Sequence, residues 1–146
     1  MTPVKIRTAT PDDAAWINER YERVHFIPSD LSRDTMVVAE IDGTPVGMGR
    51  LVPAGAGACE LGGMYVFDEH RGRGIARAIV DELIRLAGDR DVYCIPFADL
   101  TALYASAGFA LSEAALATDA VRAKLDWCAR EHERPVALLK LVKATT

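Results

Sequence analysis

The sequence predicts an α/β fold for one domain that spans residues 1–146. Residues 59–95 have the pattern of a strand, a glycine-rich turn, a helix and a second strand, which is the crossover unit that joins two parallel strands. Asp42-Gly43 lies between two strand-like runs, a pattern typical of a hairpin and therefore of antiparallel strands. Together these observations predict a mixed sheet with helices packed against it.

The N-terminal part predicts a strand followed by a helix. Residues 4–8 alternate enough for a strand, and the helix is expected from residue 11 to about Val24. Thr10 has the residue type of a helix cap, Pro11 stands at the first helical position, and two acids follow it. This is a well-marked helix start.

The predicted hairpin has strands over residues 36–41 and 45–52. Gly47 and Gly49 interrupt the second strand, and glycines inside a strand indicate either a bulge or the close approach of another element. A second turn, over residues 54–58, leads into the central strand. Neither an internal repeat nor a low-complexity linker divides the sequence.

The central strand is predicted over residues 59–66, an apolar run with the β-branched and aromatic residues that strands favour. A polar loop and a glycine-rich turn follow. Apolar residues then recur at helical spacing and predict a helix with one apolar stripe, made of Ile75, Ile79, Leu83 and Leu86. We expect this helix to end before Gly88, and the apolar run 92–95 to complete the crossover.

Four further elements are predicted beyond the crossover. A short helix starts at Asp99 or Leu100, a weak strand covers residues 110–112, and a second helix covers residues 119–131. Residues 136–142 form a nearly continuous apolar run, which is typical of a buried strand. We assign no role to the helix over residues 119–131, for which closure over a substrate and a dimer contact both stay open.

The composition excludes several classes of protein. Half of the residues are hydrophobic and the formal net charge is −4, with a pI near 5.4. This disfavours a protein that binds nucleic acid through a broad basic surface. No apolar run reaches membrane-spanning length, and the N-terminus lacks the apolar core of a signal peptide. We therefore expect a cytoplasmic protein with neither a membrane nor a nucleic-acid partner.

Cys59, Cys94 and Cys128 are odd in number and widely spaced, and no C-x-x-C pair occurs. Neither a disulfide framework nor a zinc site is therefore expected. Each of the three lies in an apolar or helical run, so we interpret them as small buried hydrophobic residues. We predict no metal site.

The turn after the central strand has the features of a phosphate cradle. A helix that starts at such a turn has free backbone amides, and its dipole favours negative charge. Gly72 and Gly74 remove side chains that would keep a phosphate away, while Arg71, Arg73 and Arg77 add positive charge. The alternative is that the glycines only make a tight turn and the arginines are solvated.

Two familiar phosphate motifs do not fit this turn. Gly74 is followed by Ile75 rather than Lys, which excludes a P-loop, and Arg77 occupies the third glycine position of a dinucleotide-binding fingerprint. The stretch instead resembles the GNAT N-acetyltransferase signature [QR]-x-x-G-x-[GA], here Arg71-x-x-Gly74-x-Ala76 after Met64-Tyr65-Val66. Leu103-Tyr104 before Gly108-Phe109 resembles a second GNAT signature.

The resemblance implies a fold, a cosubstrate and a binding site for it. The GNAT fold is a mixed, mostly antiparallel twisted sheet of about six to seven strands, with helices on both faces and a central βαβ unit that binds acyl-CoA. In that family acetyl-CoA is the cosubstrate. The residues that match its binding site are Met64, Tyr65 and Val66 at the end of the central strand, and Arg71, Gly72, Arg73, Gly74, Ile75 and Ala76 in the loop.

The resemblance also implies two catalytic residues. Glu60 lies eleven positions before Arg71, where several family members carry the base that takes the proton of the amine; the alternative is a solvated glutamate at a strand edge. Tyr104 matches the general acid that protonates the CoA thiolate; the alternative is a core tyrosine, since it belongs to an apolar stripe. His25, His70 and His132 are dispersed and expected at the surface. His25 adjoins the acceptor wall, and either it or water could replace Glu60 as the base. Phe97 stands where the family often has Asn, so one cofactor contact is expected to be missing.

The function implied is transfer of an acetyl group from acetyl-CoA to a primary amine, with a small molecule favoured over a protein as acceptor. Phe26 and Asp30 are the candidate acceptor contacts, and Asp34 and Glu40 could also attract a cation. The alternative is a non-catalytic module of the same fold that binds or senses acyl-CoA. A different phosphate ligand, a longer acyl donor and a homodimer, the last suggested by family habit alone, also stay open.

Overall fold

A computed structural model describes residues 3–143 and contains a seven-stranded sheet with the order β1-β2-β3-β4-β5-β7-β6. In these residues β4 and β5 are parallel, and all the other neighbouring strands are antiparallel. The predicted mixed, mostly antiparallel sheet is therefore confirmed. The strands are β1 (Lys5–Thr8), β2 (Thr35–Ile41), β3 (Thr44–Pro53), β4 (Ala58–Val66), β5 (Asp91–Cys94), β6 (Phe109–Leu111) and β7 (Leu139–Leu141).

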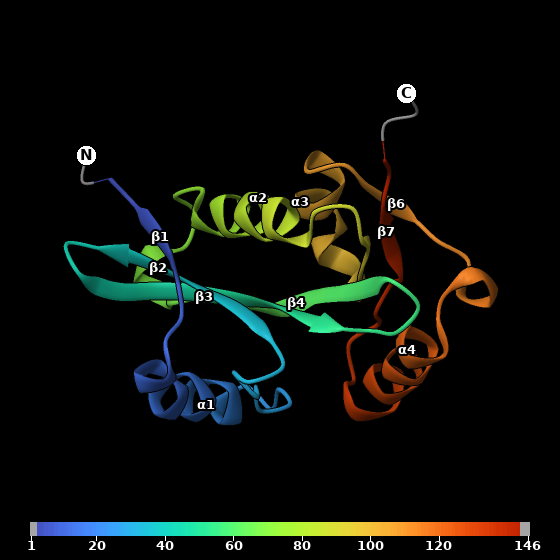
Figure 1. The fold of residues 1–146 in the computed structure, drawn as a ribbon, viewed down its shortest axis with the longest axis horizontal. Coiled ribbons are helices and arrows are strands. Elements are labelled where there is room, and N and C mark those ends of the chain that lie inside the picture. The colour runs from blue at the N-terminus through green and yellow to red at the C-terminus, as the bar shows by residue number, and fades with distance from the viewer. Residues whose placement is uncertain (1–2, 144–146) are drawn as a thin grey trace.

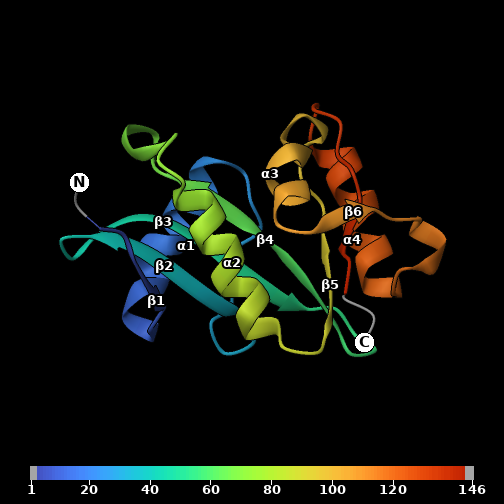
Figure 2. The same cartoon turned by 90° about the horizontal axis from the view of Figure 1, so that it is seen from above.

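Helices cover both faces of the sheet, as predicted. Figure 1 shows α2 and α3 on one face and α1 and α4 on the other. Seen from above, α2 lies over the middle of the sheet, between its N-terminal and C-terminal parts (Figure 2). The α-helices are α1 (Ala14–Arg23), α2 (Ile75–Ala87), α3 (Thr101–Ser106) and α4 (Asp119–Glu131), and the short 3-10 turns are η1 (Pro11–Asp13), η2 (Asp68–His70), η3 (Ala98–Leu100) and η4 (Ala114–Leu116).

The apolar stripe of α2 forms the centre of the core. Ile75, Ile79 and Leu83 are buried against the sheet. Gly49 of β3 makes this contact possible, because a Cβ atom at Gly49 would lie 2.7 Å from Ile79 Cγ2 and 2.7 Å from Met64 Sδ. The predicted close approach at the glycines of this strand is therefore confirmed.

A bulge deforms β4 beside this contact. Met48 pairs with Tyr65 and Arg50 pairs with Gly62, so β4 has one residue more than β3 between these pairs. Gly63 lies within the bulge at φ +58°, and its carbonyl accepts a 2.7 Å hydrogen bond from the Tyr21 hydroxyl of α1. The bulge therefore ties the central strand to the helix on the opposite face from α2.

The last strand is shorter than predicted. We expected a strand over residues 136–142, but β7 covers Leu139–Leu141. Its neighbour β5 ends at Cys94, and Pro96 follows, which has no N–H to donate to a ladder. The chain before β7 pairs there only through an isolated bridge between Phe97 and Val136. In this bridge the Ala137 N–H donates to the Pro96 carbonyl.

The three cysteines are buried and free, which confirms their interpretation as small core residues. Within residues 3–143 no helix has both the length and the apolar content needed to cross a bilayer.

Candidate functional site

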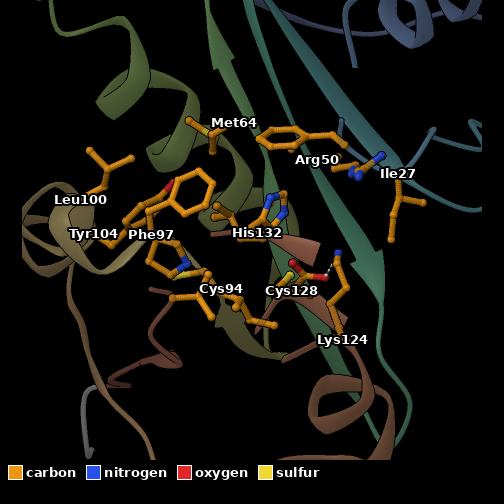
Figure 3. Close-up of a pocket in the computed structure, with 18 of the residues that line it drawn as sticks. Ile27, Arg50, Met64, Cys94, Phe97, Leu100, Tyr104, Lys124, Cys128 and His132 are labelled. Carbon is orange, nitrogen blue, oxygen red and sulfur yellow. Dashed lines mark hydrogen bonds and ion pairs between the residues drawn. The ribbon is translucent and has the colours of Figure 1, made fainter. Parts of the chain in front are cut away.

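A pocket lies where β4 and β5 separate. The two strands pair in parallel from Ala58 with Asp91 as far as Leu61 with Cys94, and beyond this point β4 continues alone on that side. The pocket has a volume of about 130 Å³, roughly ten times what one water needs. It is lined by β3, β4, the chain after β5, α3, α4 and the loop after α1 (Figure 3).

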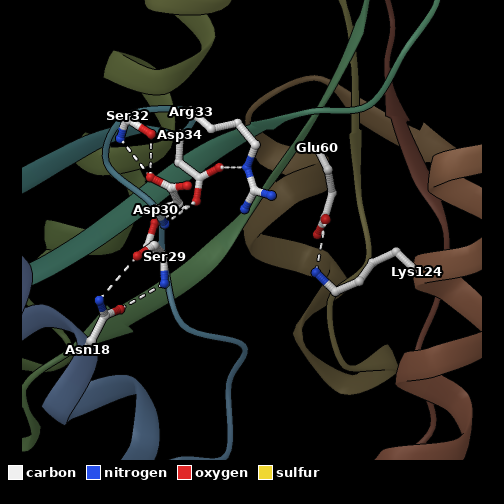
Figure 4. A network of polar contacts seen from close by, with 8 residues as sticks. All are labelled: Asn18, Ser29, Asp30, Ser32, Arg33, Asp34, Glu60 and Lys124. Atoms are coloured by element: carbon white, nitrogen blue, oxygen red, sulfur yellow. Dashed lines mark hydrogen bonds and ion pairs between the residues drawn. The ribbon is translucent and has the colours of Figure 1, made fainter.

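Glu60 of β4 lines this pocket and is 8% exposed. Its Oε1 accepts a 3.0 Å hydrogen bond from the Lys124 ammonium of α4, as Figure 4 shows. The structure therefore overturns the alternative of a solvated glutamate at a strand edge. The second carboxylate oxygen is left to accept a proton or a hydrogen bond from a molecule in the pocket.

Tyr104 of α3 also lines the pocket and is 6% exposed. Its ring packs edge-on against Phe109, so the residue belongs to the core as well as to the pocket wall. Burial, together with the nearby Cys94 and Glu60, raises the pKa of the Tyr104 phenol above its usual value. The phenol consequently stays protonated throughout the neutral range and can act as a proton donor.

The glycine-rich loop before α2 is exposed and shaped for an anion. Gly72 and Gly74 have φ angles of +81° and +77°, and a Cβ atom at either position would meet nothing within 4 Å. Arg71 ties the loop to the end of β4 by donating from Nε to the Val66 carbonyl at 3.2 Å, and it also pairs with Asp68. The backbone amides at the start of α2 therefore face open space beside positive charge, an arrangement that fits a phosphate group.

Met64 at the bulge, and Tyr65 and Val66 after it, lie in the part of β4 that has separated from β5. All three are partly exposed, and Met64 lines the pocket. The pocket and the glycine-rich loop are thus connected by the strand segment that sequence analysis selected.

A comparison with protein families identifies the chain. The family model described as the acetyltransferase (GNAT) family matches residues 5–109. The chain belongs to the acetyltransferase (GNAT) family. It is therefore an acyltransferase by family, as the two signatures predicted.

Several solved structures have the same fold as this chain. Rv2747 of Mycobacterium tuberculosis, in complex with CoA and NLQ, has a TM-score of 0.76 and 22% identity over 96% of this chain and 99% of its own. N-acetylglutamate synthase of Neisseria gonorrhoeae, complexed with coenzyme A and L-arginine, has a TM-score of 0.73 and 16% identity over 98% of this chain and 34% of its own. IAA acetyltransferase of Bacillus cereus has a TM-score of 0.68 and 17% identity over 95% of this chain and 99% of its own. Curated proteins give no match.

In this GNAT domain, the acidic residues that were predicted to attract the acceptor lie outside the pocket. Phe26 lines the pocket, but Asp30 is exposed outside it, where its carboxylate accepts hydrogen bonds from Ser32. The remaining acids are occupied elsewhere: Asp34 accepts from Ser29 and Arg33 (Figure 4), and Glu40 pairs with Arg7. None of these three acids lines the pocket.

The structure agrees with the surface position expected of His25 but not with the one expected of His132. His25 is exposed and does not line the pocket. His132, which we interpreted as a surface residue, lines it and lies edge-on to three aromatic rings: Phe97 at 5.2 Å, Trp127 at 5.8 Å and Phe26 at 6.4 Å between ring centroids. Phe97, which stands where the family often has Asn, therefore contributes to an aromatic wall.

Sequence reasoning missed the residues that α4 and β3 bring to this acetyltransferase's pocket. Lys124, Trp127 and Cys128 come from α4, which lies beyond the part of the chain that the family model matches. Arg50 comes from the middle of an apolar strand, where a charged residue is unusual. That position was the available signal, because a charge inside a buried strand needs a partner.

Proposed function

We propose that this acetyltransferase moves the acetyl group of acetyl-CoA to a primary amine of a small-molecule acceptor. The observation that carries the proposal is that Glu60 and Tyr104 line one pocket where β4 and β5 separate. One side chain can accept a proton and the other can donate one. A direct transfer from thioester to amine requires both.

The residues that would hold acetyl-CoA are the backbone of Arg71, Gly72, Arg73, Gly74, Ile75 and Ala76 and the strand segment of Met64, Tyr65 and Val66. Positive φ angles, open space and arginine side chains make the loop suitable for the pyrophosphate. The separated strand leaves backbone groups for the pantetheine arm and for the carbonyl oxygen. Relatives of the same fold that were solved with CoA support this assignment.

Glu60 and Tyr104 would divide the proton transfers between them. Glu60, directly or through water, accepts the proton that the amine loses as its nitrogen bonds to the carbonyl carbon. Tyr104 donates its proton to the sulfur as the carbon–sulfur bond breaks, and the products are the N-acetylated amine and CoA. Tyr104 is protonated when the reaction begins, and its raised pKa keeps it so in alkaline solution as well.

Two observations favour a small acceptor over a protein. The pocket is concave, has a volume of about 130 Å³ and is bordered by an aromatic wall and by α4, so that it fits a small molecule better than a folded surface. The names of two structural relatives, an N-acetylglutamate synthase and an IAA acetyltransferase, point in the same direction.

The test compares binding with turnover. Acetyl-CoA is titrated by calorimetry, and amines are screened by release of the CoA thiol. We expect Tyr104→Phe to lower turnover about 100-fold and to change acetyl-CoA affinity less than about threefold. Tyr93→Phe is the matched control, since Tyr93 is equally buried and does not line the pocket. It should leave both quantities unchanged.

Two outcomes would contradict the proposal. If acetyl-CoA binds but no amine releases thiol, the protein is a non-catalytic acyl-CoA-binding module. If acetyl-CoA does not bind, transfer of an acetyl group from acetyl-CoA is excluded.

A further inference from the structure

We propose that the acceptor carries a carboxylate and that Arg50 binds it, so that the substrates of this site are amino acids or other small aminocarboxylates. The inference rests on the proposed function, in which the pocket holds an amine acceptor. The carboxylate is a second group, in addition to the amine, by which the protein recognises the acceptor.

Arg50 is a buried cation whose partner is missing. The residue is 4% exposed, and its Nη1 is buried without any hydrogen-bond partner. Within residues 3–143 no carboxylate lies within 4.0 Å of its guanidinium. Arg7 shows the usual arrangement, since it bonds both Asp13 and Glu40. The contrast marks Arg50 as the exception.

A buried and unpaired guanidinium is costly, because it loses hydration without gaining a counter-charge. The ring of Tyr21, whose centroid lies 4.6 Å from Arg50 Cζ, offsets part of this cost. An aromatic face cannot satisfy the in-plane N–H groups, however. An anion from outside the chain would satisfy them.

Arg50 also occupies the right place for such an anion. It pairs with Gly62 across β3 and β4, two residues from the Glu60 carboxylate along β4. Two neighbouring hollows share Ile27, Arg50, Glu60 and Lys124 in their walls. Figure 3 shows Arg50 on the side of the pocket where Ile27 and Lys124 lie. A molecule bound here can reach Arg50 and Glu60 together.

The charges of the walls select an anion. The fixed charges that line the two hollows are those of Arg33, Arg50, Lys124 and Glu60. Glu60 pairs with Lys124, and Arg33 pairs with Asp34, which leaves Arg50 uncompensated. A polyamine would be repelled. A carboxylate matches the flat, two-pronged guanidinium, and the amine of the same molecule is then left for Glu60.

The experiment measures binding separately from turnover. The protein, with and without CoA, is titrated by calorimetry with L-amino acids that carry a primary amine and with their carboxamides. Arg50→Met is the test variant, because replacing an unpaired buried charge by an apolar side chain of similar length is not expected to unfold the protein. Arg20→Met is the matched control, since Arg20 stacks on Phe67 at 3.9 Å and does not line either hollow.

We expect at least one amino acid to bind about 30-fold more tightly than its carboxamide, a preference that Arg50→Met abolishes and Arg20→Met retains. Equal binding of acids and amides, binding by neither, or a preference that survives in Arg50→Met would overturn the inference.

Thiol release separates this result from the proposed function. Release with acids and amides alike leaves the transferase intact and removes the carboxylate site. Arg50-dependent binding of amino acids without thiol release supports the carboxylate site and contradicts the transferase.

Discussion

The loop that we expect to hold acetyl-CoA is one exposed stretch of sequence, residues 71–76, whereas the pocket beside it is assembled from separate elements. Arg50 comes from β3, Glu60 from β4 and Lys124 from α4, and all three are largely buried. The loop takes its shape from local backbone preferences. The pocket exists only after a strand pair and a C-terminal helix have packed, so the acceptor can change through α4 without altering the loop.

The strongest test of this division is Glu60→Gln. It keeps the shape of the side chain and removes its ability to take a proton, so we expect turnover to fall by about 10²–10⁴-fold. Affinity for acetyl-CoA should change by less than about threefold, because the loop is untouched. Thiol-release kinetics and calorimetry measure the two quantities.

The control for this variant is Glu40→Gln. Glu40 is also a largely buried carboxylate with an ion pair, to Arg7 at 3.0 Å, but it does not line the pocket. Both variants should be destabilised by about 1–3 kcal/mol in urea unfolding, and only Glu60→Gln should lose turnover. Unchanged turnover in Glu60→Gln would assign the base to water or to another group.

A change in the loop should weaken acetyl-CoA binding and leave the acceptor pocket unaffected. Gly74 is the N-cap of α2 and has a positive φ, which Asp and Asn both tolerate better than other residues. Gly74→Asp adds a negative charge where the pyrophosphate is expected, and we predict about 100-fold weaker binding of acetyl-CoA than in the isosteric Gly74→Asn. Calorimetry on both variants measures the difference.

Amino-acid binding to the Gly74 variants completes this test. It should be alike in both, since Arg50 lies in a different part of the fold. Equal acetyl-CoA affinity in the two variants would show that the phosphates do not use this loop.

Salt should affect acetyl-CoA binding at the loop more than amino-acid binding in the pocket, but this difference is the smallest that we predict. The arginines beside the loop are exposed, whereas Arg50 is 4% exposed. Raising NaCl from about 50 to about 500 mM should weaken acetyl-CoA binding about fivefold, and binding of an amino acid at Arg50 less than about twofold, because buried pairs are screened less. Calorimetric titrations at the two salt concentrations test this. Equal salt dependence of the two affinities would show that Arg50 is screened by solvent as much as the arginines beside the loop.

The same contrast explains how much the sequence could predict. The hairpin turn, the stripe of α2 and the glycine-rich loop follow local rules, and the structure has each of them. Lys124 lies 64 residues from Glu60, and nothing in a single sequence indicates that these side chains meet. His132 was expected at the surface, although the rings of Phe26, Phe97 and Trp127 surround it, the first two from distant parts of the sequence. The length of β7 depends on Pro96 of a different segment.

The bulge at Gly63 has a consequence for how this sequence can diverge. A methyl group at Gly63 would collide with the Tyr21 hydroxyl and lie 2.9 Å from Arg50 Nε, so three residues from α1, β3 and β4 share one space. A larger residue at Gly63 therefore requires both a shorter side chain at Tyr21 and a displaced Arg50, and it must also adopt a positive φ. Loss of Arg50 alone does not make this room, because the Tyr21 hydroxyl stays in place. Descendants of this protein that keep Tyr21 are therefore expected to keep glycine at the bulge, whatever residue they have in place of Arg50.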